Sequence, residues 1–186
     1  MSTGTRTRRG FIKTLAAGSA LGALGACTIS KSGNVTTIKV NVAKVKAYGT
    51  AGINAVSTVL SIAAVASAIG APAVAVIETA STALQAALAA FAQTAGTSVT
   101  VSYDDTSVKS AINSVLADLQ TVASDLTAAI TGASSKVSDA ALSTATTALS
   151  ALKTVLSVFE GILGVVSLSE PAMTEAQALR VLHVTV

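Results

Sequence analysis

The sequence predicts an all-α protein, an antiparallel up-and-down bundle of about four long helices. Apolar residues recur at intervals of three and four along four long stretches, which is the period of a helix with one buried face. The joints between these stretches are short and carry Gly, Pro or paired Ser. Only 11% of the 186 residues are charged, and Ala, Val, Leu, Ser and Thr dominate. This composition suits helices that pack closely.

The first part of the predicted domain, residues 35–46, is compatible with two conformations. Ile38, Val40 and Val42 alternate with polar residues, which favours a strand. The three- and four-residue spacing that continues along the chain favours a helix instead. We expect a short extended segment near 35–42, followed by a helix from about Lys44.

Glycine and proline mark the ends of the first two helices. The first helix is expected to run through Ile69 and to end at Gly70, because glycine readily adopts the backbone conformation that closes a helix. Pro72 is expected in the first turn of the second helix, where its missing N–H costs nothing. The second helix should end at Gly96, and the alternation of polar and apolar residues over 97–103 predicts another short extended segment.

The third helix has the most regular pattern in the chain. Asp104, Asp105 and Thr106 offer N-cap side chains ahead of it, and Gly132 lies at its expected end. Such heptad-like spacing is what helices packed at a shallow angle require. The apolar stripe of this helix consists of Val108, Ile112, Val115, Leu119, Val122, Leu126 and Ala129.

A fourth helix is expected after Ser134 and Ser135, and it should end before Glu170 and Pro171. A last short helix around residues 173–182 is expected to follow. The apolar stripe of the fourth helix consists of Leu142, Ala145, Leu149, Leu152, Leu156, Phe159, Leu163 and Val166.

The N-terminal part of the chain carries two short motifs at the ends of a mildly apolar run. Arg8 and Arg9 are followed within a few residues by Phe11 and Lys13, and the run closes with Leu-Gly-Ala-Cys at Cys27. A basic start, a short apolar middle and small residues before a cleavage site are the parts of a secretory leader. The first motif resembles the twin-arginine (Tat) export signal of bacteria. The second resembles the lipobox of lipoprotein signal peptides.

The resemblance implies a division of the chain and an address for it. Residues 1–26 would be a Tat-type lipoprotein signal peptide, 27–34 a tether, and 35–186 a single helical-bundle domain. Cleavage before Cys27 and acylation of that cysteine would anchor the protein in a membrane of the bacterial cell envelope, on the periplasmic side or at the cell surface. Twin-arginine substrates cross the membrane already folded, which suits a chain whose only cysteine is Cys27.

The charge balance gives no indication of a nucleic-acid partner. The whole chain has a formal net charge of +3, but four of its twelve basic residues lie in the leader, which has no acidic residue. The remaining eight basic and nine acidic residues give a net charge of −1. The basic residues are also scattered and lack aromatic neighbours, so no nucleic-acid surface is expected.

Few side chains are suited to catalysis, to metal binding or to holding a cofactor. The single histidine, His183, lies close to the C-terminus and is expected at the surface. Asp104 and Asp105 are expected to cap a helix, because no calcium-loop ligands follow them. Asp118 and Asp125, seven residues apart, are expected on a solvated edge of the third helix. We therefore predict no enzyme activity, no metal site and no cofactor.

One stretch approaches the length of a membrane span. Glu78 is the only charged residue between Lys46 and Asp104, and Val59–Ile77 forms nineteen mostly apolar residues. A bilayer requires about 20 such residues. A glycine and a proline interrupt the stretch, and no belt of Trp or Tyr flanks it. Two helices buried in the bundle core are therefore favoured over a transmembrane hairpin.

The function expected from these features is that of a non-catalytic cell-envelope lipoprotein. It would be held to the membrane through lipid on Cys27, and it would act as a structural or protein-interaction bundle whose partner is another protein or further copies of the chain. One alternative is a membrane-active hairpin or pore-forming protein built on residues 59–77. The other is a carrier that holds an apolar ligand between Ala-lined helices.

Export should depend on the arginine pair. Replacing both residues, Arg8→Lys with Arg9→Lys, should leave precursor in the cytoplasm, because an ammonium group does not reproduce the planar guanidinium that the export receptor reads. Cell fractionation followed by immunoblotting measures the distribution. Normal amounts of the double variant in the envelope would contradict the twin-arginine assignment.

Overall fold

The computed structural model describes residues 27–32, 35–164 and 173–185, and within these ranges the chain is mostly helical. The described residues form six α-helices and one three-stranded sheet. The helical class predicted from the sequence is therefore confirmed. Val166 and the expected helix break at Glu170 and Pro171 lie outside the described residues.

A small antiparallel sheet precedes and joins the helices. It consists of β1 (Cys27–Ser32), β2 (Val35–Asn41) and β3 (Thr100–Ser102), with β2 in the middle. The pairing register sets Cys27 opposite Val40. Both extended segments expected from the sequence are present, as β2 and β3. The segment expected to be a tether contributes β1, because its backbone groups pair with those of β2.

The first long helix, α1 (Val42–Ser61), follows β2 directly. The side chain of Asn41 accepts a hydrogen bond from the N–H of Lys44 at 3.2 Å and so caps the helix. Beyond Ser61 the chain turns sharply into the short helix α2 (Ala63–Ile69), and the two helix axes are bent by 87°.

The prediction of one continuous helix through Ile69 is therefore wrong. Ile62 leaves the helical conformation, with φ −79° and ψ 95°, although neither glycine nor proline lies at the break. The turn places α2 against α4 and α5 and buries Val65 completely. Tertiary packing of apolar side chains has outweighed local helix preference at this point.

Both ends of the second long helix and the start of the third are the predicted ones, whereas the third continues through Gly132, its expected end, to Ala133. α3 (Ala71–Ala95) lies between Gly70 and Gly96, whose φ angles of 81° and 56° favour glycine, and Pro72 occupies its first turn. α4 (Thr106–Ala133) begins at Asp105, whose carboxylate accepts hydrogen bonds from two backbone N–H groups.

Two further helices complete the described chain. α5 (Asp139–Ile162) is the fourth long helix. The short helix α6 (Glu175–Val181) begins with a capping box, in which Thr174 and Gln177 satisfy each other's backbone N–H groups.

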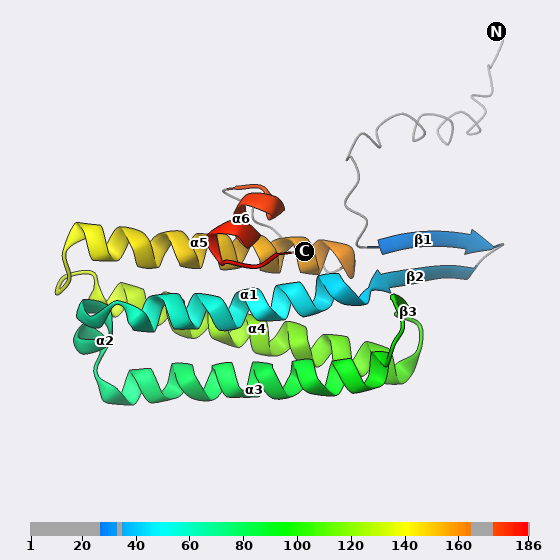
Figure 1. Cartoon of the computed structure of the whole chain (residues 1–186), viewed down its shortest axis with the longest axis horizontal. Helices are drawn as coiled ribbons and strands as arrows, with labels where there is room; N and C mark the ends of the chain where they lie inside the picture. The colour runs from blue at the N-terminus through cyan, green and yellow to red at the C-terminus, as the bar shows by residue number, and fades with distance from the viewer. Residues whose placement is uncertain (1–26, 33–34, 165–172, 186) are drawn as a thin grey trace, which may run out of the picture.

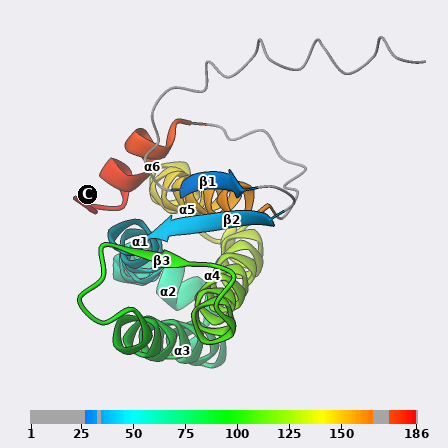
Figure 2. The same ribbon diagram turned by 90° about the vertical axis from the view of Figure 1, so that its right-hand side faces the viewer.

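The four long helices α1, α3, α4 and α5 lie side by side along the longest axis of the molecule (Figure 1). The end view shows them around a common centre, with the sheet across one end (Figure 2). Helix α2 closes the opposite end, and α6 lies on the outside against α5 and α1. The core therefore runs the length of the molecule between the long helices.

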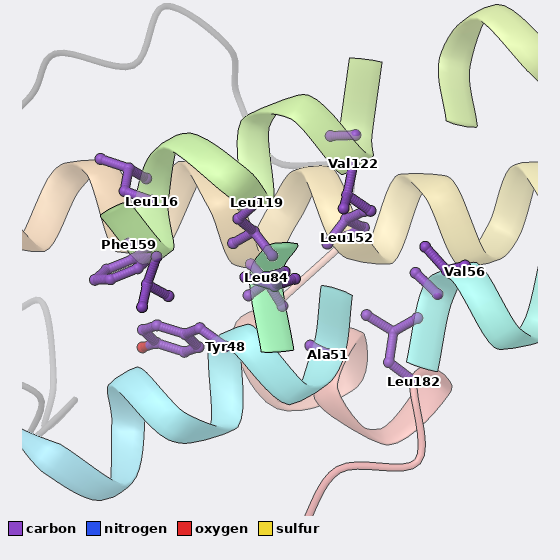
Figure 3. Packing of buried hydrophobic residues seen from close by; sticks show 14 of the residues in the cluster. Tyr48, Ala51, Val56, Leu84, Leu116, Leu119, Val122, Leu152, Phe159 and Leu182 are labelled. Atoms are coloured by element: carbon purple, nitrogen blue, oxygen red, sulfur yellow. The ribbon is translucent and has the colours of Figure 1, made fainter. Parts of the chain in front are cut away.

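The apolar stripe predicted for the third helix is buried at all seven positions. Figure 3 shows Leu119 of this stripe beside Leu84 of α3. Both leucines also face α1, whose Gly52 carries no side chain at the point of contact. Tyr48 and Phe159 extend the same core toward the sheet, with ring centroids 5.3 Å apart. Burial of this continuous apolar surface is the main source of stability.

The register of α4 can be tested by a pair of charged substitutions. Leu119→Asp should largely unfold the protein, because an unpaired buried charge costs several kcal/mol against a total stability of about 5–15 kcal/mol. Ser124 is exposed, so Ser124→Asp should change the free energy of unfolding by no more than about 0.5 kcal/mol. Circular dichroism on heating, without detergent, compares the two. Equal tolerance of both changes would contradict the register described above.

Candidate functional site

The residues of the predicted leader and lipobox fall at the edge of what the structure describes. Arg8, Arg9, Phe11 and Lys13 lie outside the described residues. Cys27 is the first residue of β1, and its backbone is paired with that of Val40. The position predicted for acylation therefore adjoins the folded domain without an intervening spacer.

The candidate titratable residues are dispersed over the molecule. His183 follows α6, is exposed and has a φ of 54°. Asp105 caps α4, and the hydroxyl of Ser107, followed by the N–H groups of Val108 and Ser107, lowers the pKa of its carboxyl. Across residues 27–32, 35–164 and 173–185, no three His, Cys, Asp or Glu side chains gather as metal ligands would.

A buried polar cluster joins α6 to α1. Glu175 is 5% exposed, and its Oε1 accepts a hydrogen bond from the Tyr48 hydroxyl at 2.9 Å. The ammonium group of Lys44 forms an ion pair with the same oxygen. The other carboxylate oxygen, Oε2, is buried and has no hydrogen-bond partner. A second link runs from the Asn54 amide of α1 to the carbonyl of Leu182, the residue after α6, at 2.8 Å.

Sequence reasoning did not find this cluster. Lys44 and Glu175 are 131 residues apart, so no local spacing connects them. A glutamate in the first turn of a short helix is also an ordinary residue there, since it complements the helix dipole. The geometry indicates a clamp between two helices, because the Lys44 and Tyr48 side chains of α1 both bind the Glu175 carboxylate of α6.

A groove follows the junction of α3 and α4 and contains two hollows. The hollow nearer α2 has a volume of about 360 Å³, and the next one has a volume of about 440 Å³. Val76 and Asp125 line both hollows, so the two form one continuous groove. The other residues of the first hollow are Ala68, Ile69, Ala73, Ile77, Ala128, Ala129, Gly132 and Lys136.

The groove carries opposite charges that are not paired with each other. Asp125 lies in its middle, and Lys136 lies at the end nearer α2. Within the described part of the chain, the only ion pair is the one between Lys44 and Glu175. Asp118 lies two turns before Asp125 on α4, and partial burial raises the pKa of its carboxyl.

Helix α3 forms a ridge with a hollow on each side. On the α1 side, a hollow of about 710 Å³ is more polar and includes Glu78, which is exposed. On the α4 side lies the groove, at whose rim Val76 is 55% exposed.

Two described helices are long and apolar enough to cross a membrane, namely α3 and α5. The bent pair α1 and α2 would be a third if it were counted as one span. The stretch 59–77, considered above as a hairpin, is divided among α1, α2 and α3 and forms no continuous helix.

The chain has no match among protein-family models, curated proteins or solved structures.

The clamp can be measured by removing its parts separately. Lys44→Met should lower the free energy of unfolding by roughly 3–5 kcal/mol, because it leaves the buried charge of Glu175 without its counter-ion. Tyr48→Phe should cost less, about 1.5–3 kcal/mol, the value of one hydrogen bond to a charged group. The double change Lys44→Met with Glu175→Leu should recover most of the loss, since it leaves no buried charge. Urea unfolding compares the variants, and a double variant no more stable than Lys44→Met alone would refute the clamp.

Proposed function

We propose that this chain is a non-catalytic lipoprotein of the bacterial cell envelope. It is exported by the twin-arginine route, cleaved before Cys27 and anchored through acyl chains on that cysteine. Its folded part acts as a structural or protein-interaction bundle. The observation that carries the proposal is the position of Cys27, which ends a lipobox-like sequence and is the first residue of β1.

The bundle is proposed to be an antiparallel, up-and-down arrangement of α1, α3, α4 and α5. Support comes from the path of the chain, along which α1 and α4 lead away from the sheet while α3 and α5 lead back (Figure 1). The buried stripe of α4 adds support, because its heptad-like spacing is that of helices packed at shallow angles.

The position of β1 supports a close anchor. Because Cys27 is already paired in the sheet, lipid on its side chain would hold the domain near the bilayer surface. In Figure 2, β1 and α3 lie on opposite sides of the molecule. The anchor would therefore leave the α3 side free for contact with a partner.

The polar residues support a role without catalysis. Glu175 is engaged by Lys44 and Tyr48, and Asp105 is engaged by the start of α4. His183 is exposed after α6 and lines none of the hollows beside α3. The hollows beside α3 are grooves on the surface, which suits contact with a macromolecule better than enclosure of a small apolar ligand.

One observation favours a second candidate, a membrane-active protein. Helix α3 reaches a mean hydropathy of 1.5 over an eighteen-residue window, of which only 28% is buried in the fold. A helix of this kind could leave its neighbours and enter a bilayer.

Replacement of the proposed lipid attachment site separates the two candidates. Cys27→Ser should release the protein into the soluble fraction outside the inner membrane, because the variant lacks the acyl chains, which supply roughly 0.8 kcal/mol per buried CH₂. Carbonate washing of membranes followed by immunoblotting measures retention. If the serine variant stays in the washed membranes, the result supports the membrane-active candidate and contradicts the lipid-anchored bundle.

A further inference from the structure

We propose that the α3–α4 groove is the contact surface between two copies of this chain. The copies are related by a two-fold axis that lies perpendicular to α4 and passes beside the hollow of about 360 Å³. The helices of the two copies therefore run antiparallel. The proposal deepens the proposed function, on which it rests, by naming a second copy as the partner of the bundle.

The shape of the groove is self-complementary. Val76 protrudes at its rim, with 55% of its surface exposed, and the recess beside it is lined largely by small and apolar side chains. On the α4 side of the recess, Ala128 has a small side chain and Gly132 has none. A Cβ built on Gly132 meets no atom within 4 Å. In a two-fold contact, the valine of each copy enters the recess of the other, as isologous interfaces require.

The charges of the groove are also self-complementary. Asp125 and Lys136 lie eleven residues apart in sequence and line the same hollow without forming an ion pair. An antiparallel two-fold contact centred between them brings each carboxylate opposite the ammonium group of the other copy. One surface thereby forms two ion pairs, and a parallel arrangement would instead oppose like charges.

The same residues argue against a lipid bilayer as the occupant of the groove. Insertion of this face would remove Asp125 from water without giving it a partner, and it would leave the Lys136 ammonium group with only the carbonyl of Ala68, at 3.5 Å. Helix α3 carries neither the basic residues nor the Trp and Tyr that hold an amphipathic helix at a membrane surface.

Disulfide cross-linking in the full-length chain tests the contact directly. Ala128 is exposed and lies in the hollow close to the proposed axis. The variant Ala128→Cys should therefore form an intermolecular disulfide, since bridged residues need Cα atoms about 4.4–6.8 Å apart. Ser124→Cys is the matched control, because Ser124 is exposed on α4 but lines neither hollow of the groove. Lysates are treated with a mild oxidant and run on non-reducing gels, with the unaltered chain showing any background from Cys27.

Charge reversal in the Ala128→Cys chain tests the arrangement of the two copies. Asp125→Lys alone, or Lys136→Asp alone, opposes like charges at two places and should reduce cross-linked dimer at least about tenfold, the factor that 1.4 kcal/mol represents. The two reversals together restore opposite charges and should restore the dimer. Circular dichroism of each variant shows that its fold is retained.

The expected result is a dimer of twice the chain mass from Ala128→Cys, little from Ser124→Cys, and recovery in the double reversal. The proposal is overturned if the folded Ala128→Cys variant stays monomeric or is cross-linked to a different protein. It is also overturned if Ser124→Cys gives as much dimer as Ala128→Cys, or if the double reversal gives no more dimer than either single change. Fractionation of the same cells keeps the anchor separate. A monomer that is still membrane-bound refutes the dimer alone, and a soluble dimer refutes the lipid anchor alone.

Discussion

The close approach of α1 to α3 and α4 is the constraint on which the rest of the structure depends. A Cβ on Gly52 would lie 2.4 Å from Leu119 Cδ1 and 2.7 Å from Leu84 Cδ2, so only glycine fits while both leucines keep their positions. Those leucines are fully buried and cannot turn away into solvent. The contact fixes the spacing of three helices, and with it the width of the groove between α3 and α4.

Features set by neighbouring residues could be predicted from the sequence. The buried stripe of α4, the glycine and proline at the junction before α3, and the cap at Asp105 each depend on side chains a few positions apart. Their physical causes are local, namely helical periodicity, backbone conformation and one short hydrogen bond. The extended segments observed as β2 and β3 could be predicted for the same reason, because polar and apolar residues alternate along them.

Features that depend on distant contacts could not be predicted. The break at Ile62 has no sequence signal, since it follows from the fit of α2 against α4. The Lys44–Glu175 pair joins opposite ends of the chain, and β1 acquires its conformation only by pairing with β2. The sequence of either helix alone also does not predict the groove, because Asp125 and Val76 come together only when α3 and α4 pack. Periodicity identifies the buried face of a helix but not its neighbour.

The place of β1 in the sheet bears on the order in which such a protein would mature. Among the described strands, β1 lies at the edge of the sheet and pairs with β2 alone. A chain that crosses the membrane already folded would present the bond before Cys27 at the end of this strand. Hydrolysis of that bond would require a peptidase to reach the residues around it, and those that follow the bond are paired with β2. Peeling β1 from β2 would expose them while the helical core stays closed, so maturation would require the edge strand to detach and not the domain to unfold.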